Sequence, residues 1–323
     1  MLNYFDKYIV YLDPETLKYM YLSYTKKRNY PVMNKLHSVL HEGFTNNILV
    51  TPLSMDHLFP YIKENQIDIN ILNMMGGLGQ IQFLQKFTIT TLQLIRIINH
   101  FFNQDYKKPV WKDAFSSDPD EKNYPGFNKY SSIAAMNVQT AIEREKKNSQ
   151  IYEFLEGFKE GKTIDSISSR HFKLLWEKFQ DIIIPYLPVD GLPESNIKQF
   201  LEYEEIKEIP EFHIISNIIY PLLESYDFED IEHGLKDELL LAVETIASYL
   251  PYCNFYVTKV DIAELVNMAG INEPYNVRVY DHNESSLYKL IQDLSDLSKV
   301  TKERKLKEMR KTKFRRTGSN FNV

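Results

Sequence analysis

Cysteine and glycine are scarce in this chain of 323 residues, which contains one cysteine, Cys253, and 11 glycines. A single cysteine excludes a disulfide within the chain and a structural zinc cluster built from several thiolates. It is also typical of proteins in the reducing cytoplasm. Few glycines beside 22 tyrosines and 19 phenylalanines favour helices packed through aromatic side chains over a loop-rich β fold.

Apolar runs long enough for a membrane or a secretion signal are missing too. Residues 78–102 form a long helical pattern with a broad apolar face, but Lys86, Arg96 and several glutamines make it too polar to cross a bilayer. The N-terminal sequence MLNYFDKYIVYLD has neither the basic region nor the apolar run of a signal peptide. We therefore expect a cytoplasmic protein with no membrane partner.

Common nucleotide-binding and zinc-protease motifs are absent. GGLG at residues 76–79 lacks the GK of a P-loop and the third glycine of a dinucleotide fingerprint, so it reads as a turn between helices. His37 and His41 stand at i and i+4, yet HSVLHE does not have the HExxH order of zinc proteases. Two frequent classes of enzyme are thereby disfavoured.

The negative net charge hides a strongly basic C-terminal segment. Residues 299–316 carry ten Lys or Arg against two Glu, a balance of +8, so the rest of the chain carries −14 of the total of −6. A phosphate backbone would be attracted to this tail and repelled elsewhere. The residues that we expect to hold such a backbone are Arg304, Lys307, Arg310 and Arg315. A solvated, partly helical end without a ligand is the alternative.

Both ends of the chain show the alternation of strands and helices that predicts a parallel sheet. Apolar strands are expected at residues 8–13 and 47–54, and again at 254–258 and 275–281. Pro14 suits the first turn of a helix, and Ser54 can cap another that begins MDHLFPYIKE. The further helices are predicted at 14–24, 31–43 (ended by Gly43), 212–224, 229–249, 260–269 and 284–311.

The middle of the chain lacks this alternation. Its patterns indicate helices at 78–102, 131–160 and 164–184. We therefore predict an α/β domain assembled from residues 1–65 and 205–298, a helical insertion at 66–204, and a basic tail at 299–323.

Acidic side chains occur where two parts of this expected domain would meet. Asp13 ends the first strand, and Asp227, Glu229, Asp230 and Glu232 open the helix that leads into the strand NFYVT. Carboxylates at the carboxyl edge of a parallel sheet lie where α/β proteins bind ligands, and they suit a hard divalent metal. Asp13 as a helix N-cap, and the acids as a first helical turn, are the structural alternatives.

Four segments together resemble motifs of one family. They are YIVYLD ending on Asp13, TPLSMDHL with His57, DIEH at 230–233, and LPYCNFYVTK at 250–259. The chain thereby resembles the PIN-like ribonuclease superfamily, in particular a loosely defined group of bacterial PIN-like proteins. The resemblance covers residues 1–65 and 225–281, under half of the chain. It implies a PIN-like parallel sheet flanked by helices.

The resemblance also implies an activity and a set of residues. PIN-like nucleases hydrolyse RNA phosphodiesters with Mg²⁺ or Mn²⁺ held by acids, because the metal neutralises charge and lowers the pKa of bound water. Here Asp13 and Asp230 would hold the metal, and Glu232 or Asp227 would assist in catalysis through water. Asp261 or Asp56, with Glu232, would complete the site. His57 and His233 would contact the phosphate, although each also reads as a partly buried polar residue.

Two positions depart from the family pattern L-P-Y-C-D-x-F-x-T-D. Asn254 replaces the first Asp and can still offer a neutral oxygen to a metal, whereas Lys259 replaces the second and cannot ligate while charged. A metal-dependent endoribonuclease is therefore our first expectation. The alternative is a catalytically silent PIN-like scaffold that binds a protein partner, or its own copy, through the helical insertion. A third option is a nucleic-acid-binding protein without hydrolytic activity.

Overall fold

A computed structural model describes residues 7–54, 57, 62–63, 66–67, 74–75, 77–78, 86–103, 114–115, 209–211, 213–215, 217–218 and 236–318. Its centre is a parallel sheet of four strands in the order β2-β1-β5-β6. The strands are β1 (Tyr8–Leu12), β2 (Leu49–Val50), β5 (Phe255–Val257) and β6 (Arg278–Tyr280). The predicted α/β class with a parallel sheet is confirmed, and the sheet joins the two ends of the described sequence.

The strand β1 is central, and its side chains alternate between two cores. Ile9 and Tyr11 face one core, whereas Val10 and Leu12 face the other, and all four are fully buried. Leu12 pairs in register with Val257 of β5, so the carboxyl ends of these strands lie side by side.

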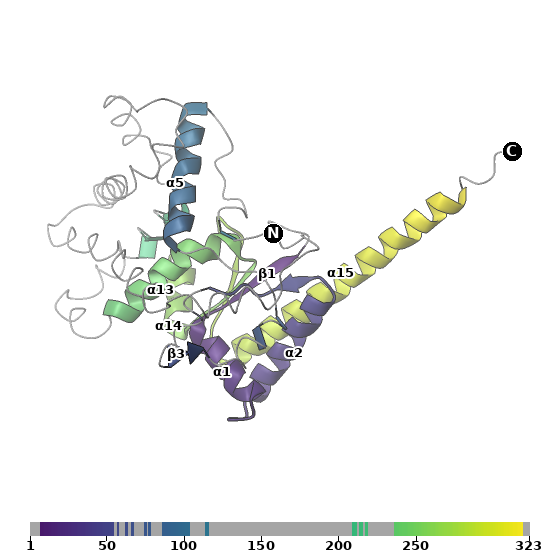
Figure 1. Ribbon diagram of the computed structural model, residues 1–323, viewed down its shortest axis with the longest axis horizontal. Helices are drawn as coiled ribbons and strands as arrows, with labels where there is room; N and C mark the ends of the chain where they lie inside the picture. Colours follow the sequence, from purple (N-terminus) through teal and green to yellow (C-terminus); the bar gives the residue numbers. More distant parts are fainter. Residues whose placement is uncertain are drawn as a thin grey trace.

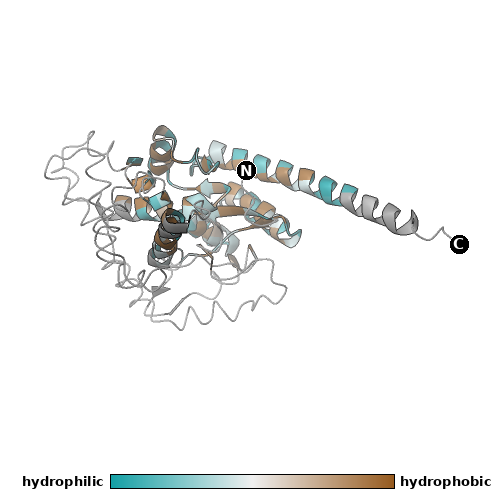
Figure 2. Cartoon of the chain, turned by 90° about the horizontal axis from the view of Figure 1, so that it is seen from above, coloured by the Kyte–Doolittle hydropathy of each residue, from teal (hydrophilic) through white to brown (hydrophobic). Residues whose placement is uncertain are grey.

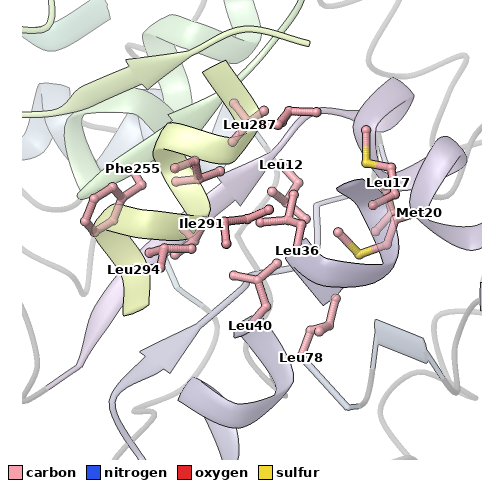
Figure 3. Packing of buried hydrophobic residues seen from close by; sticks show 14 of the residues in the cluster. Leu12, Leu17, Met20, Leu36, Leu40, Leu78, Phe255, Leu287, Ile291 and Leu294 are labelled. Atoms are coloured by element: carbon pink, nitrogen blue, oxygen red, sulfur yellow. The ribbon is translucent and has the colours of Figure 1, made fainter. Parts of the chain in front are cut away.

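Helices cover both faces of the sheet (Figure 1). The first face packs against α1 (Pro14–Tyr24), α2 (Pro31–Thr45) and the start of α15 (Glu284–Gly318). Figure 3 shows the core on this side, which includes Leu12, Leu36, Leu40 and Ile291. Each such buried side chain contributes about 1.5–3 kcal/mol of transfer free energy.

The opposite face packs against α13 (Lys236–Tyr249), α14 (Val260–Met268) and residues of α5 (Lys86–Asn103). A short 3₁₀ helix, η5 (Leu250–Tyr252), joins α13 to the strand β5. This core is rich in tyrosine: the ring of Tyr11 stacks on Tyr256 with centroids 4.7 Å apart and lies 5.7 Å from Tyr249. Ile89 of α5 belongs to the same core, so this part of the expected insertion packs onto the sheet domain.

The helix α1 begins and ends where the sequence predicts, at residues 14 and 24. The helix α2 instead continues through Gly43 to Thr45, so the prediction that Gly43 ends it is wrong. A Cβ on Gly43 would lie 2.3 Å from Leu49 Cδ1, so glycine is needed there for close packing of the helix on β2. The chain reverses at Asn47 instead, which has a φ of 58°.

Two further boundaries differ from the prediction. The helix expected at residues 55–64 is short: His57 is helical, but Ile62–Lys63 already forms a strand, β3, which pairs antiparallel with β4 (Gln66–Ile67). Pro60 lies in the middle of that expected helix and cannot donate its backbone bond. The second boundary is the start of the helix expected at 78–102. Leu78 lies in a turn, and its carbonyl accepts a hydrogen bond from Thr51 N at 3.1 Å, whereas the helix α5 is described from Lys86.

The helix α15 is a single element of 35 residues that runs through the expected boundary at residue 299. Its first half packs on α2, and its second half extends away from the other described helices (Figures 1 and 2). No helix in the described ranges is long and apolar enough to cross a membrane. The predicted helices at 131–160 and 164–184 lie outside the described residues.

Candidate functional site

The chain leaves the neighbouring strands β1 and β5 on opposite faces of the sheet. After β1 it enters α1 on one face, and after β5 it enters α14 on the other. Such a switch point, outside the carboxyl ends of the strands, is where open α/β sheets bind ligands. Asp13 stands there, with its backbone N–H donating to the carbonyl of Val257 at 3.0 Å.

Asp13 is held by the start of α1. It is the N-cap of this helix, and its Oδ1 accepts a hydrogen bond from Thr16 N at 2.7 Å. Pro14 follows as the first helical residue, where a missing N–H costs nothing. Asp13 is 7% exposed, so its carboxylate is nearly buried at the edge of the sheet.

His282, which follows β6, completes a polar cluster with Asp13 and Thr16. Its Nε2 lies 2.9 Å from Asp13 Oδ1 and 2.8 Å from Thr16 Oγ1. Burial lowers the pKa of His282, but the hydrogen bond and charge of Asp13, with the charge of Glu15, outweigh it and raise the pKa above its usual value. We call these three residues the Asp13–His282 cluster.

The turn between β6 and α15 fixes the imidazole in this position. Asp281 Oδ1 accepts a hydrogen bond from Asn283 N at 2.7 Å, and Asp281 N donates to Ser286 Oγ at 3.0 Å. Asn283 then accepts the first helical bond of α15, from Leu287 N at 2.9 Å. His282 is therefore held between two residues whose bonds define the turn.

Lys259 lies at the same edge and pairs with Glu15. It occupies the N-cap position of α14, and its Nζ is 3.7 Å from Glu15 Oε2. Both side chains are partly exposed, at 41% and 34%, so water weakens this ion pair. The described ion pair of Lys259 is thus with Glu15, whereas that of Asp13 is with His282.

Asn254 lies at the opposite edge of the sheet. Its Oδ1 accepts a hydrogen bond from Ile9 N at 2.8 Å, and its own N–H donates to the carbonyl of Ile9 at 2.9 Å. Ile9 is near the start of β1, whereas Asp13 follows its end. The expectation that Asn254 offers an oxygen to a metal beside Asp13 is therefore wrong, because a whole strand separates the two side chains.

His57 is a buried residue that contacts the end of β1, next to Asp13. It is 1% exposed, its Nδ1 accepts a hydrogen bond from Ser54 N at 2.9 Å, and its Nε2 bonds the carbonyl of Leu12. Its ring lies 5.1 Å from that of Tyr11. Both ring nitrogens thus tie the residues after β2 to the end of β1, which gives His57 a structural role in holding the edge that carries Asp13.

The remaining expected site residues are not gathered around Asp13 by the described structure. Asp261 is exposed in the first turn of α14. Arg304 and Lys307 are exposed on the second half of α15, and Arg310 and Arg315 follow on the same helix. Outside the described residues lie Asp56, Asp227, Glu229, Asp230, Glu232 and His233.

The described part of the chain does not by itself form a metal centre. No group of three or more acidic, histidine or cysteine side chains gathers there in a way that could hold an ion. Asp13 and His282 offer one carboxylate and one imidazole, a donor pair that suits a transition metal such as Mn²⁺ only with further ligands. The acids that the sequence suggests as such ligands, Asp230 and Glu232, lie outside the described residues.

Sequence reasoning missed Thr16 and His282. The signal for His282 was present, because it directly follows the strand expected at 275–281, and the carboxyl ends of parallel strands share one edge. Comparison of the chain with protein-family models, with curated proteins and with solved structures found no match.

Proposed function

We propose that the protein is a divalent-metal-dependent endoribonuclease whose centre is Asp13 at the carboxyl edge of the parallel sheet. The observation that carries the proposal is the place of Asp13 at the switch point between β1 and β5. There it lies beside the partly exposed imidazole of His282 and the buried hydroxyl of Thr16. The resemblance of the chain to PIN-like nucleases supplies the reaction.

The ion pair of Lys259 supports this proposal. A lysine ammonium seated on Asp13 would compete with a cation for the same carboxylate. Lys259 Nζ lies 3.7 Å from Glu15 Oε2, and the described ion pair of Asp13 is with His282. The departure of this position from the family pattern is therefore compatible with a cation at Asp13.

The course of α13 supports a contribution from Asp230. Because α13 ends beside the amino end of β5 and packs on the sheet, it runs antiparallel to the strands, and its start at Lys236 lies toward the carboxyl edge (Figure 1). Asp230 precedes Lys236 by six residues, which can span at most about 20 Å. We therefore include Asp230 in the proposed site.

In this proposal Asp13 and Asp230 hold Mg²⁺ or Mn²⁺, with Glu232 and Asp261 in support. The metal supplies charge neutralisation and activates water for attack on the phosphodiester. Thr16 N and His282 hold the Asp13 carboxylate in one orientation.

Cleavage of labelled single-stranded RNA in Mn²⁺ or in EDTA tests the proposal. The variant Asp13→Asn keeps a side chain able to cap α1 but removes the charge, so we expect cleavage to fall at least a hundredfold while the fold persists. Asp296→Asn on α15 is the matched control, since Asp296 is exposed and bonds Gln292 and Lys299. Equal cleavage by wild type and Asp13→Asn would contradict the assignment.

A second candidate function is a silent PIN-like scaffold that binds a protein partner. Its supporting observation is that protein groups already pair with the carboxylates at this edge. Asp13 bonds Thr16 N and His282, and Glu15 pairs with Lys259. This candidate predicts no calorimetric binding of Mn²⁺ at millimolar concentration and no cleavage. A stable complex or dimer in light scattering would support it, whereas Mn²⁺ binding that Asp13→Asn abolishes would exclude it.

A further inference from the structure

The basic half of α15 begins where its packing on the sheet domain ends. Leu287, Leu290, Ile291 and Leu294 belong to the core, and Ser298 is still buried at 8% exposure. Further along, two lysines reach across to the end of α2. The Nζ of Lys302 lies 2.7 Å from Glu42 Oε1, and the Nζ of Lys305 donates to the carbonyl of Asn47 at 3.2 Å. These bonds hold the helix in a fixed direction at the point from which it extends outward.

The helix also starts at the candidate site and runs away from it. Glu284 is the second residue after His282, whose ring contacts Asp13. At a rise of about 1.5 Å per residue, Lys307 lies about 35 Å and Arg315 about 47 Å along the axis from that start. Figure 1 shows this half of α15 beyond all other described elements. The positive charge of the tail is therefore far from Asp13.

The charge density of this arm matches a nucleic-acid backbone. Ten Lys or Arg within residues 299–316 occupy about 27 Å of helix, close to one charge per phosphate spacing of about 3.4 Å. The rest of the chain carries −14, which repels a polyanion from the remaining surface. A phosphate backbone is thus attracted to the arm and held off most other surfaces.

We propose that the second half of α15 is a nucleic-acid-anchoring arm, separate from the hydrolytic site, which binds the RNA backbone without regard to sequence. An RNA that occupies both must span at least about 27 Å, the distance along the axis from Glu284 to Lys302, or about eight stacked nucleotides. The protein thus selects long RNA, held at one end by the arm while another part lies at the Asp13–His282 cluster. The length selection rests on the proposed function, but the binding by the arm does not.

The binding step is measured apart from cleavage, with Asp13→Asn protein in EDTA and a fluorescent RNA of forty nucleotides. On this background, Lys307→Gln, Arg310→Gln and Arg315→Gln together remove three charges but keep good helix formers. We expect the slope of log K against log salt to fall by about 2, since each lost contact to a single strand removes about 0.7. The affinity at 0.1 M salt falls at least tenfold.

The matched control removes the same charge from another surface. Lys18, Lys27 and Lys35 are exposed on or directly after α1 and on α2, and all three are changed to Gln. We expect the affinity of this control to stay within twofold of the parent value, and its salt slope to stay within 0.5 of the parent slope. If the control variant loses as much RNA affinity as the tail variant, binding depends on net charge alone and the arm is not the binding site. Unchanged affinity in the tail variant overturns the proposal directly.

Cleavage with the active-site Asp13 intact then tests the separation of arm and site. A four-nucleotide RNA is too short to reach both, so the tail variant cleaves it at the wild-type rate, whereas the KM for the forty-nucleotide RNA rises at least tenfold. Equal losses of cleavage activity on the two RNAs would show that the arm and the hydrolytic site are not separate. If the protein binds vesicles of anionic lipid more tightly than RNA at equal salt, the arm is a membrane-binding element and the proposal of an RNA-binding arm is overturned as well. No cleavage of either RNA by wild type contradicts the proposed function and leaves the binding result standing.

Discussion

At the scale of single residues, the edge of the sheet contains groups that satisfy one another. Asp13 accepts from Thr16 N and pairs with His282, and Lys259 pairs with Glu15 nearby. The ring of His282 is therefore surrounded by two negative groups and one positive group. Burial lowers the pKa of His282, as does the charge of Lys259, but the two carboxylates raise it by more, and the net direction is upward.

This balance predicts a pH dependence of stability. Because the pKa of His282 is raised on folding, its charged form stabilises the native state fully below the unfolded value of about 6.5. That contribution is lost as pH rises through the folded pKa. We expect the urea-unfolding free energy of wild type to exceed that of His282→Gln most at pH 5.5, with the gap narrowing by pH 8.5. A gap that widens with pH would contradict the upward shift.

At the scale of elements, the contact between α2 and β2 is set by one missing side chain. Gly43 lies against Leu49, where an added Cβ would be 2.3 Å from Cδ1. Gly43→Ala is therefore expected to destabilise the protein by about 1–3 kcal/mol through overpacking, despite the better helix propensity of alanine.

Chemical denaturation measures this loss against Lys35→Ala, which changes an exposed residue of the same helix and is expected to stay within about 0.5 kcal/mol. The double variant with Leu49→Ala should lose less than the sum of the two single changes, because the smaller residue 49 leaves room for the new methyl group. Additive losses would show that the two side chains do not meet.

The elements also show what could be predicted from the sequence. The helix α1 matched its predicted bounds, since Asp13 and Pro14 are local signals for a helix start. The predicted end of α2 at Gly43 was wrong because this glycine allows close packing against β2 and does not end the helix. His282 was missed because its contact with Asp13 joins positions 269 residues apart, and only the strand order brings them together. The suggestion that Asn254 could offer an oxygen to a metal came from the family motif alone, although the strand predicted at 254–258 already places Asn254 at its amino end.

At the scale of the whole molecule, the sheet domain and the outer half of α15 are separable. The core residues of α15 end before its basic half, and the described bonds of Lys302 to Glu42 and of Lys305 to Asn47 lie at the surface. Surface ion pairs contribute about 0–1 kcal/mol. A chain shortened to residues 1–306 should therefore keep its melting temperature within about 3 °C by calorimetry. A larger loss would mean that the outer half stabilises the domain.

The pairing of β1 with β5 has a consequence for synthesis on the ribosome. Val10 pairs with Phe255, so the central strand made first receives its main neighbour only after most of the chain has been translated. Until then β1 has β2 alone as a strand partner, through Tyr8 and Ile9, while Tyr11 and Leu12, which are fully buried in the folded protein, lack their partners on β5. Nascent chains are thus exposed to aggregation for tens of seconds, at about 5–20 residues added per second. Chaperone binding to the first fifty residues is the expected protection during this interval.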